Sequence, residues 1–304
     1  MNSFGLFQFT FFISLENRAE KVQIYFFPNL EIVIFYLFSD SSIILKMKLC
    51  YWKCRGLAHP IRLLLEYCEE ECEYATLECG KAPFFDKKNW YENKYDIMEN
   101  FDFPNLPYFE DRDVYLTHHV AIIQYLGRKY GLSPITDIEH QNVDMIREQA
   151  GDLKNNLISV MYFFEHRKNG QEPTQSEIVQ KKQNIAPLLK FNISDIGRKY
   201  KKQKAKDEKA IWMAGRRLTY IDFLLYEQVD YARNLFPTLL EADEYCSAMK
   251  EFMLSFEQLP TIKKYMTSGK FEKFPFYGKR SYLGSSLETC YQDIPCTFER
   301  KSFF

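Results

Sequence analysis

Apolar residues from Met47 onward follow the spacings of short strands and amphipathic helices. The run "MKLCYW" (47–52) is short and apolar, which predicts a strand. Pro60 suits the first turn of a helix. Four apolar residues then fall on one helical face: Ile61, Leu64, Leu65 and Cys68. The run "CEYATLEC" (72–79) predicts a second strand.

Two more strands and a helix follow. The runs "LPYFE" (106–110) and "VYLT" (114–117) predict strands joined by a tight turn at "DRD". A helix is predicted from about His119 to Tyr130, because Gly131 is typical of the position just past a helix end and Pro134 lies beyond it. This order, β-α-β and then β-β-α, predicts a small mixed sheet covered by helices.

Beyond the linker "GLSPITDIEHQN" (131–142), the chain is predicted to be helical throughout. One long apolar stripe contains Val143, Ile146, Leu153, Leu157, Met161 and Phe164. A second contains Ile178, Ile185, Leu188 and Leu189. The basic run 197–209 could bind nucleic acid, but its composition favours a solvated loop or helix end.

The stretch "LTYIDFLLYEQ" (218–228) contains a helix-capping box. Thr219 and Asp222 have the spacing at which each side chain bonds the other's backbone N–H, and Leu218 and Phe223 can form a hydrophobic staple. The apolar residues that follow surround the helix axis, which predicts a buried helix.

Length and charge narrow the class of protein. At 304 residues the chain has room for about two domains. Its 40 basic and 41 acidic residues give a net charge of −1, which provides no field to attract nucleic acid or an anionic membrane. The eight cysteines form neither a regular disulfide framework nor a zinc motif. We therefore expect a cytoplasmic protein with reduced thiols and no metal.

Residues 1–46 have a different character. They are rich in Phe and Ile, but charged residues interrupt them too often for a membrane span of about 18 residues. A signal peptide would need a basic start and a small-residue cleavage site, and neither is convincing. We interpret this segment as an over-extended gene model that is not part of the fold, in preference to a targeting segment.

Several stretches resemble the mu class of the glutathione S-transferase family, from Met47 to about Leu283. The similar segments are "YWKCRGLAHPIRLLLEY", "APFFDKKNW", "DFPNLPYFED" and "AGRRLTYIDF". Mite and vertebrate mu-class enzymes are the nearest likenesses. The resemblance implies a thioredoxin-like α/β glutathione-binding domain at 47–133 and an all-α domain with the electrophile site at 134–285, followed by a tail at 286–304. It also implies a cytoplasmic homodimer that binds no nucleic acid or membrane.

The activity that the resemblance implies is attack of the glutathione thiolate on hydrophobic electrophiles, as in detoxification. A free thiol, with a pKa near 8.5, is only slightly ionised at neutral pH. Tyr51 matches the tyrosine whose hydroxyl stabilises this thiolate in mu-class enzymes. Two alternatives stay open: a catalytically weak relative that binds apolar ligands, and a thiol reductase that uses cysteine. Cys50 and Cys54, on either side of Tyr51, motivate the second alternative.

The resemblance also implies residues that bind the substrates. Those that match glutathione-binding positions are Trp52, Lys87, Trp90, Lys94, Asn105, Leu106, Pro107 and, from the second subunit, Asp152. Pro107 is expected to follow a cis peptide bond that presents the Leu106 backbone to glutathione. Tyr162 matches a tyrosine near the electrophile, and Phe103 matches an aromatic residue inserted into the partner subunit.

The pair His118-His119 departs from the family, which usually has Gln-Ser at this position. Adjacent side chains point in different directions, so a shared metal site is not expected. A backbone N–H at the helix start remains available to the γ-glutamyl carboxylate of glutathione, and an imidazole could donate a second hydrogen bond. We therefore expect weaker binding than in a Gln-Ser member, with affinity rising as pH falls from about 7.5 to 6.

Overall fold

The chain forms two units, Met1–Lys46 and Met47–Phe304. The computed structural model describes 47–81, 84–162, 173–278 and Ser281, together with the backbone of three strands in the first unit. These strands, β1 (Phe7–Leu15), β2 (Arg18–Phe26) and β3 (Ile34–Phe38), form an antiparallel sheet in the order β1-β2-β3. The sequence analysis did not predict them.

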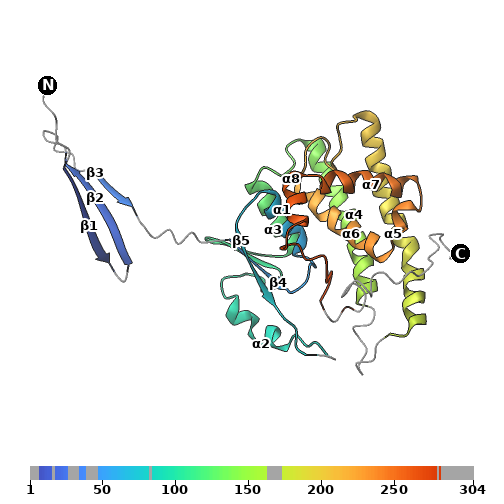
Figure 1. Ribbon diagram of the computed structural model, residues 1–304, viewed down its shortest axis with the longest axis horizontal. Helices are drawn as coiled ribbons and strands as arrows, with labels where there is room; N and C mark the ends of the chain where they lie inside the picture. Colours follow the sequence, from blue (N-terminus) through green and yellow to red (C-terminus); the bar gives the residue numbers. More distant parts are fainter. Residues whose placement is uncertain are drawn as a thin grey trace. The chain divides into compact units, whose positions relative to one another are not determined.

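A four-stranded mixed sheet opens the second unit (Figure 1). It has the order β5-β4-β6-β7, formed by β4 (Met47–Trp52), β5 (Cys72–Leu77), β6 (Tyr108–Asp111) and β7 (Val114–Thr117). β4 and β5 are parallel, and the other two pairs are antiparallel. All four strands were predicted from the apolar runs.

Three helices accompany this sheet: α1 (His59–Tyr67), α2 (Lys88–Ile97) and α3 (His119–Lys129). α1 was predicted from its apolar face and α3 from the glycine and proline beyond its end, but α2 was missing from the predicted order. Only Trp90 of α2 is buried, whereas Tyr91, Tyr95 and Ile97 are exposed. A helix that buries one side chain leaves little apolar periodicity in its sequence.

The rest of the described chain is helical. Its α-helices are α4 (Asp137–Met161), α5 (Gln175–Lys206), α6 (Tyr220–Leu235), α7 (Glu244–Glu257) and α8 (Pro260–Met266), with a short 3₁₀ turn at Leu239–Glu241. In Figure 1, α4 to α7 form a bundle beside the sheet, and α2 lies away from that bundle. Among the helices that the structure describes, none is both long and apolar enough to cross a membrane.

The predicted linker 131–142 is too long. Thr136 and Glu139 form a capping box, so α4 begins at Asp137 and takes up the second half of that segment. The basic run 197–209 is largely the end of α5, as predicted. The predicted α4 stripe is buried from Val143 to Met161, and Phe164 lies outside the described residues.

Helix α6 is the core of the helical domain and contacts α1, α3 and α4. Its start is the predicted capping box: the Thr219 N–H donates to the Asp222 carboxylate at 2.8 Å, and the Met213 N–H donates to the same group at 2.8 Å. Nearly every α6 side chain is buried, as predicted. This helix therefore links the sheet's covering helices to the bundle.

Candidate active site

Strand register brings three predicted site segments to one end of the sheet. Cys50 of β4 pairs with Tyr108 of β6, and Tyr108 pairs with Thr117 of β7. The next position in the same direction across the sheet is occupied by Tyr51 after Cys50, by Pro107 before Tyr108 and by His118 after Thr117. Because neighbouring strands lie about 4.8 Å apart, these three positions are adjacent across the sheet.

Tyr51 is buried at the end of β4 and remains protonated. Burial raises the pKa of its hydroxyl well above the ordinary value, and Cys54 adds to this, while a backbone hydrogen bond from Leu57 opposes it. The Leu57 bond uses a lone pair of the hydroxyl oxygen. The hydroxyl proton is therefore kept for donation to another group, the role that was predicted for Tyr51.

Gly56 makes room for Tyr51. It has φ +44°, and a Cβ at this position would lie 2.4 Å from Tyr51 Cε1 and 2.7 Å from its hydroxyl oxygen. The ring is thus packed directly against the backbone of the loop that follows β4. Neither a side chain nor a change of backbone conformation can be accommodated here without moving Tyr51.

We expect Gly56→Ala to lower turnover in the predicted conjugation reaction about tenfold, because it displaces the Tyr51 ring. The positive φ should also cost about 1–2 kcal/mol of stability. Initial rates and thermal unfolding of the purified variant measure the two effects. Gly269→Ala is the control, since a Cβ at Gly269 meets nothing within 4 Å. Equal behaviour of the two variants would contradict this account of Gly56.

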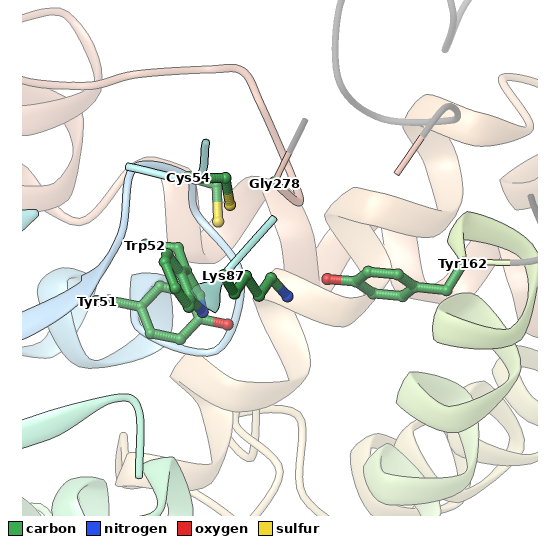
Figure 2. Close-up of a pocket in the computed structure, with 7 residues that line it drawn as sticks. Tyr51, Trp52, Cys54, Lys87, Tyr162 and Gly278 are labelled. Carbon is green, nitrogen blue, oxygen red and sulfur yellow. The ribbon is translucent and has the colours of Figure 1, made fainter. Parts of the chain in front are cut away.

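Tyr51 opens into a pocket of about 280 Å³, a volume that includes open solvent (Figure 2). Its lining residues are Tyr51, Trp52, Cys54, Cys79, Lys87, Tyr162 and Gly278. The hydroxyls of Tyr51 and Tyr162 both point into the space between the sheet and the end of α4. Four predicted site residues, Tyr51, Trp52, Lys87 and Tyr162, therefore line one cavity.

The predicted tryptophan and lysine positions form a cluster beside this pocket. Trp52 and Trp90 are in edge contact, with ring centroids 6.4 Å apart, and the Lys87 ammonium lies 5.2 Å from the Trp52 ring. Lys94 stands one helical turn beyond Trp90 on α2, where its ammonium lies 4.7 Å from the Tyr95 ring. Lys94 does not line the pocket itself.

The Asn105-Leu106-Pro107 turn has the predicted cis peptide bond before Pro107. The Leu106 N–H donates to Asn105 Oδ1 at 2.9 Å, which fixes the turn before β6. Tyr162, on the other side of the pocket, packs its ring against Tyr277 at 5.6 Å.

His118 and His119 differ in their surroundings. His118 is exposed, takes a positive φ of 66° that is uncommon outside glycine, and contacts Thr117 Oγ1 through Nδ1 at 2.9 Å. Its ring also contacts Phe103, with centroids 6.4 Å apart. His119 is the first residue of α3 and is half-buried.

The predicted pH response cannot come from His119. Burial, together with the nearby Lys154 and His118, lowers the pKa of His119 to about 3. A group with that pKa is neutral throughout the interval from about 6 to 7.5, in which affinity was expected to rise. The expectation is therefore wrong for His119, because the sequence did not reveal its burial or its position beside Lys154.

The side chains of Asp152 and Phe103 are both exposed to solvent. Asp152 is exposed on α4, and the Phe103 side chain is 72% exposed although it is a large aromatic group. The contacts predicted for these two residues lie in a second subunit, so they stay predictions.

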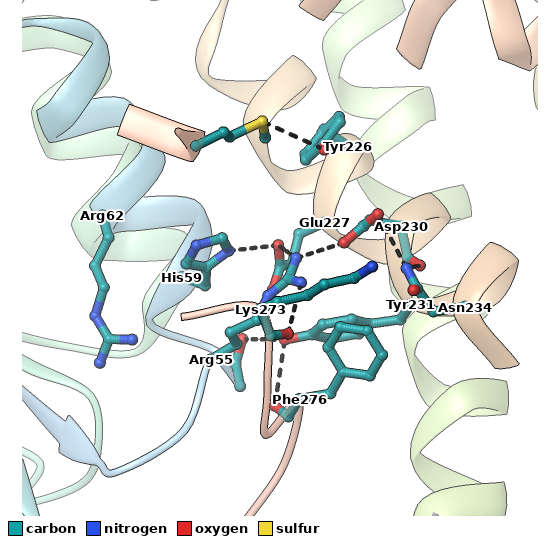
Figure 3. Close-up of polar contacts among 12 residues, drawn as sticks. Arg55, His59, Arg62, Tyr226, Glu227, Asp230, Tyr231, Asn234, Lys273 and Phe276 are labelled. Atoms are coloured by element: carbon teal, nitrogen blue, oxygen red, sulfur yellow. Dashed lines mark hydrogen bonds and ion pairs between the residues drawn. The ribbon is translucent and has the colours of Figure 1, made fainter. Parts of the chain in front are cut away.

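A buried charge cluster holds the loop between Tyr51 and α1 (Figure 3). Arg55 pairs with Glu227 at 2.6 Å and with Asp230 at 2.7 Å, both on α6. His59 Nδ1 also contacts Glu227, at 2.6 Å. The Arg55 and Gly56 backbone N–H groups donate to the carbonyls of Pro275 and Phe276. The loop that follows Tyr51 is thus fixed both to α6 and to the segment Pro275–Phe276.

Several residues of the site were not found from the sequence. Gly278 and Cys79 line the pocket, and Gly56 packs against Tyr51. The unusual density of cysteines between Cys50 and Cys79 was the only signal for Cys79. The return of residues 275–278 to the loop after β4 has no local sequence signal.

Among the described residues, no three His, Cys, Asp or Glu side chains gather into a group that could hold a metal ion. The predicted cysteine nucleophile also lacks support from its surroundings. Burial raises the pKa of Cys54 to about 12, with Arg62 acting in the opposite direction. A cysteine that serves as the first nucleophile toward a free substrate needs a lowered pKa.

Comparison with known proteins agrees with this fold. Family models for the glutathione S-transferase N-terminal and C-terminal domains match residues 47–128 and 152–269. Glutathione S-transferase Mu 3 of Homo sapiens is 35% identical over 239 residues, which cover 79% of this chain and 96% of that protein. Glutathione S-transferase Mu 2 of Rattus norvegicus is 36% identical and covers 78% and 97%.

Among solved structures, the crystal structure of the glutathione S-transferase Blo t 8 superposes with a TM-score of 0.65. It is 28% identical, and the match covers 78% of this chain and 99% of that one. This agrees with the predicted architecture of a thioredoxin-like domain followed by an all-α domain. The chain therefore belongs to the glutathione S-transferase family, and within it to the mu class.

Proposed function

We propose that this protein conjugates the thiol of glutathione to hydrophobic electrophiles. The observation that carries the proposal is the protonated Tyr51 hydroxyl, which lines the pocket. Its oxygen accepts a hydrogen bond from the Leu57 backbone N–H, so its proton is free to be donated. In the reaction the sulfur of the glutathione thiolate attacks an electrophilic carbon, and the leaving group departs with the bonding electrons. A tyrosine that donates a hydrogen bond to the thiolate lowers the pKa of the thiol.

Glutathione is the co-substrate in this proposal, and each predicted residue has a part in holding it. Trp52, Lys87 and Trp90, which contact one another beside the Tyr51 pocket, would bind the glycine end of glutathione together with Lys94, since ammonium groups suit a carboxylate. The Asn105-Leu106-Pro107 turn offers backbone groups to the peptide. His118 and the backbone at the start of α3 offer donors to the γ-glutamyl carboxylate. Tyr162 would contact the electrophile.

The same proposal includes a homodimer in the cytoplasm. Phe103 is largely exposed, and insertion into a partner subunit would bury it. Asp152 would then reach the amine of glutathione in the neighbouring subunit. Size-exclusion chromatography with light scattering measures the mass of the assembly.

The activity is tested on the purified full chain. We expect retention on immobilised glutathione, elution by free glutathione, and conjugation of a chlorodinitrobenzene-type aryl halide followed by absorbance. Retention without turnover would favour a ligand-binding protein. Neither retention nor turnover would reject the proposal and leave the fold unaffected.

The histidine pair gives a prediction about affinity. The double variant His118→Gln with His119→Ser should bind glutathione about fivefold more tightly, because a smaller hydrogen-bonding pair gains about 1 kcal/mol. Isothermal titration calorimetry at pH values of about 6 and 7.5 measures affinity and its pH dependence.

Single variants separate the two histidines. His119→Ser should leave any pH dependence unchanged, since His119 is neutral across this interval. His118→Gln tests whether the exposed neighbour contributes to it. Loss of the pH dependence in His119→Ser alone, or no gain in affinity in the double variant, would contradict this assignment.

A further inference from the structure

Two cysteines line the same pocket as Tyr51. Cys54 follows β4 in the loop that continues to α1, and Cys79 follows the parallel strand β5. Both residues line the pocket. Cys54 interacts electrostatically with Tyr51 and with Cys79. The chemistry proposed for Tyr51 does not use either thiol.

The pairing of the two strands brings Cys54 and Cys79, which follow the paired strand ends, to the same pocket. Each residue of β4 pairs with the β5 residue 25 positions later, from Met47 with Cys72 to Trp52 with Leu77. The pairing continues past the strand ends, because the Lys53 N–H donates to the Leu77 carbonyl at 2.9 Å and the Lys53 ammonium donates to Glu78 at 2.9 Å. Cys54 and Cys79 are the next residues of the two segments, and there the Cys54 N–H turns back to the Trp52 carbonyl at 2.6 Å.

This arrangement suits a disulfide. Adjacent strands lie about 4.8 Å apart, and disulfides join residues whose Cα atoms are about 4.4–6.8 Å apart. Both thiols are reduced in this structure. A covalent link could therefore form with little movement of the backbone.

The two thiols differ in access. Cys54 is 3% exposed, whereas Cys79 is half-buried at the pocket. An incoming disulfide would therefore react with the more exposed Cys79 first. The buried Cys54 would then react with Cys79 in a second step. Burial keeps Cys54 largely protonated, but a neighbouring thiol can act at an effective concentration of about 10⁵ M or more, which offsets a small thiolate fraction.

We propose that Cys54 and Cys79 are a redox-active thiol pair that is oxidised by glutathione disulfide at the mouth of the glutathione site. In the first step the Cys79 sulfur attacks one sulfur of glutathione disulfide, forms a mixed disulfide and releases one glutathione thiolate. In the second step the Cys54 sulfur attacks the Cys79 sulfur and releases the second glutathione. The protein loses two hydrogen atoms and glutathione disulfide gains them.

The pair would make the site responsive to the ratio of glutathione to its disulfide. A Cys54–Cys79 bond would tie the loop that follows Tyr51 to the segment that leads to Lys87, two walls of the same pocket. The proposal rests on the proposed function only in that glutathione disulfide is taken to enter this pocket. Its test therefore measures thiols and mass, and does not depend on conjugation.

The full chain is incubated with glutathione disulfide, quenched with acid and alkylated, then reduced and labelled with a second reagent for peptide mass mapping. We expect Cys54 and Cys79 to take up the second label in place of the first, in equal amounts. A portion digested without reduction should contain a peptide linking the two residues. Cys68, which is half-buried in the same domain but does not line the pocket, should keep the first label.

Variants distinguish the two steps. Cys54→Ser should trap the mixed disulfide, seen as a gain of one glutathione at Cys79. Cys79→Ser should form neither the mixed disulfide nor the internal one, and Cys68→Ser should behave as the unchanged chain. Diamide, an oxidant without a glutathione peptide, should also close the pair.

The proposal would be overturned by the absence of a Cys54–Cys79 peptide with both oxidants, or by equal oxidation of Cys68. Closure by diamide but not by glutathione disulfide would also overturn it, since the pair would then not exchange with glutathione. If the pair closes with both oxidants while conjugation is absent, the thiol pair stands and the proposed function fails.

Discussion

Replacing Arg55 with methionine should lower the free energy of unfolding by about 3–5 kcal/mol, because it removes the guanidinium that neutralises the buried Glu227 carboxylate. Asp230 keeps a second cation, Arg233, at 2.7 Å. Arg55 is 1% exposed, and its guanidinium contacts Glu227 and Asp230. The same group lies 4.8 Å from the Phe276 ring. The variant therefore loses the link between the loop after Tyr51, helix α6 and the segment around Phe276. Urea denaturation followed by circular dichroism measures the change.

Arg216→Met is the matched control. Arg216 pairs with Asp207 at the surface, where water screens the charges, so this variant should unfold at the same urea concentration as the unchanged chain. If Arg55→Met unfolds no earlier than Arg216→Met, the buried cluster does not stabilise the fold.

The cluster also predicts how stability depends on pH. Burial alone would raise the pKa of Glu227, but Arg55 and His59 lower it from 4.5 to about 2. A carboxylate with a lowered pKa contributes stability that is complete above its unfolded pKa and is lost as pH falls toward the folded value. Stability should therefore decline between about 4.5 and 2, and less steeply in Arg55→Met.

Much of the fold could be predicted because its elements are local. The apolar runs of β4 to β7 and the apolar faces of α1, α4 and α6 each lie within a short stretch of sequence. The Tyr51 position and the turn before Pro107 are equally local, and strand register then brings them together. Local patterns of this kind can be identified without knowing the tertiary structure.

The rest depends on contacts between distant residues. Arg55 and Glu227 are 172 positions apart, and neither has a sequence pattern that marks a buried ion pair. Lys154, on α4, acts on His119 only in the folded chain, so the lowered pKa of His119 could not be predicted from the sequence. Helix α2 was missed because it buries Trp90 and little else.

Replacing Tyr51 with phenylalanine should lower turnover about 10²-fold, because the glutathione thiolate loses one hydrogen-bond donor. The change removes the hydroxyl that opens into the pocket and leaves the ring that packs against Gly56. Affinity for glutathione should barely change, because the predicted binding groups for its carboxylates and backbone lie elsewhere. The pKa of bound glutathione should rise, so the rate should recover partly as pH is raised.

Two measurements make this result specific to the hydroxyl. Ultraviolet absorbance of the bound thiolate as a function of pH reports the pKa of glutathione directly, and calorimetry reports its affinity. Tyr162→Phe is the matched control, since it removes a second hydroxyl from the same pocket, on the side predicted for the electrophile. That variant should leave the thiol pKa unchanged even where turnover falls. If Tyr51→Phe keeps full turnover, the thiolate is stabilised by another group. Cys54→Ser is then the next variant to test, because Cys54 is the titratable side chain with the largest effect on Tyr51.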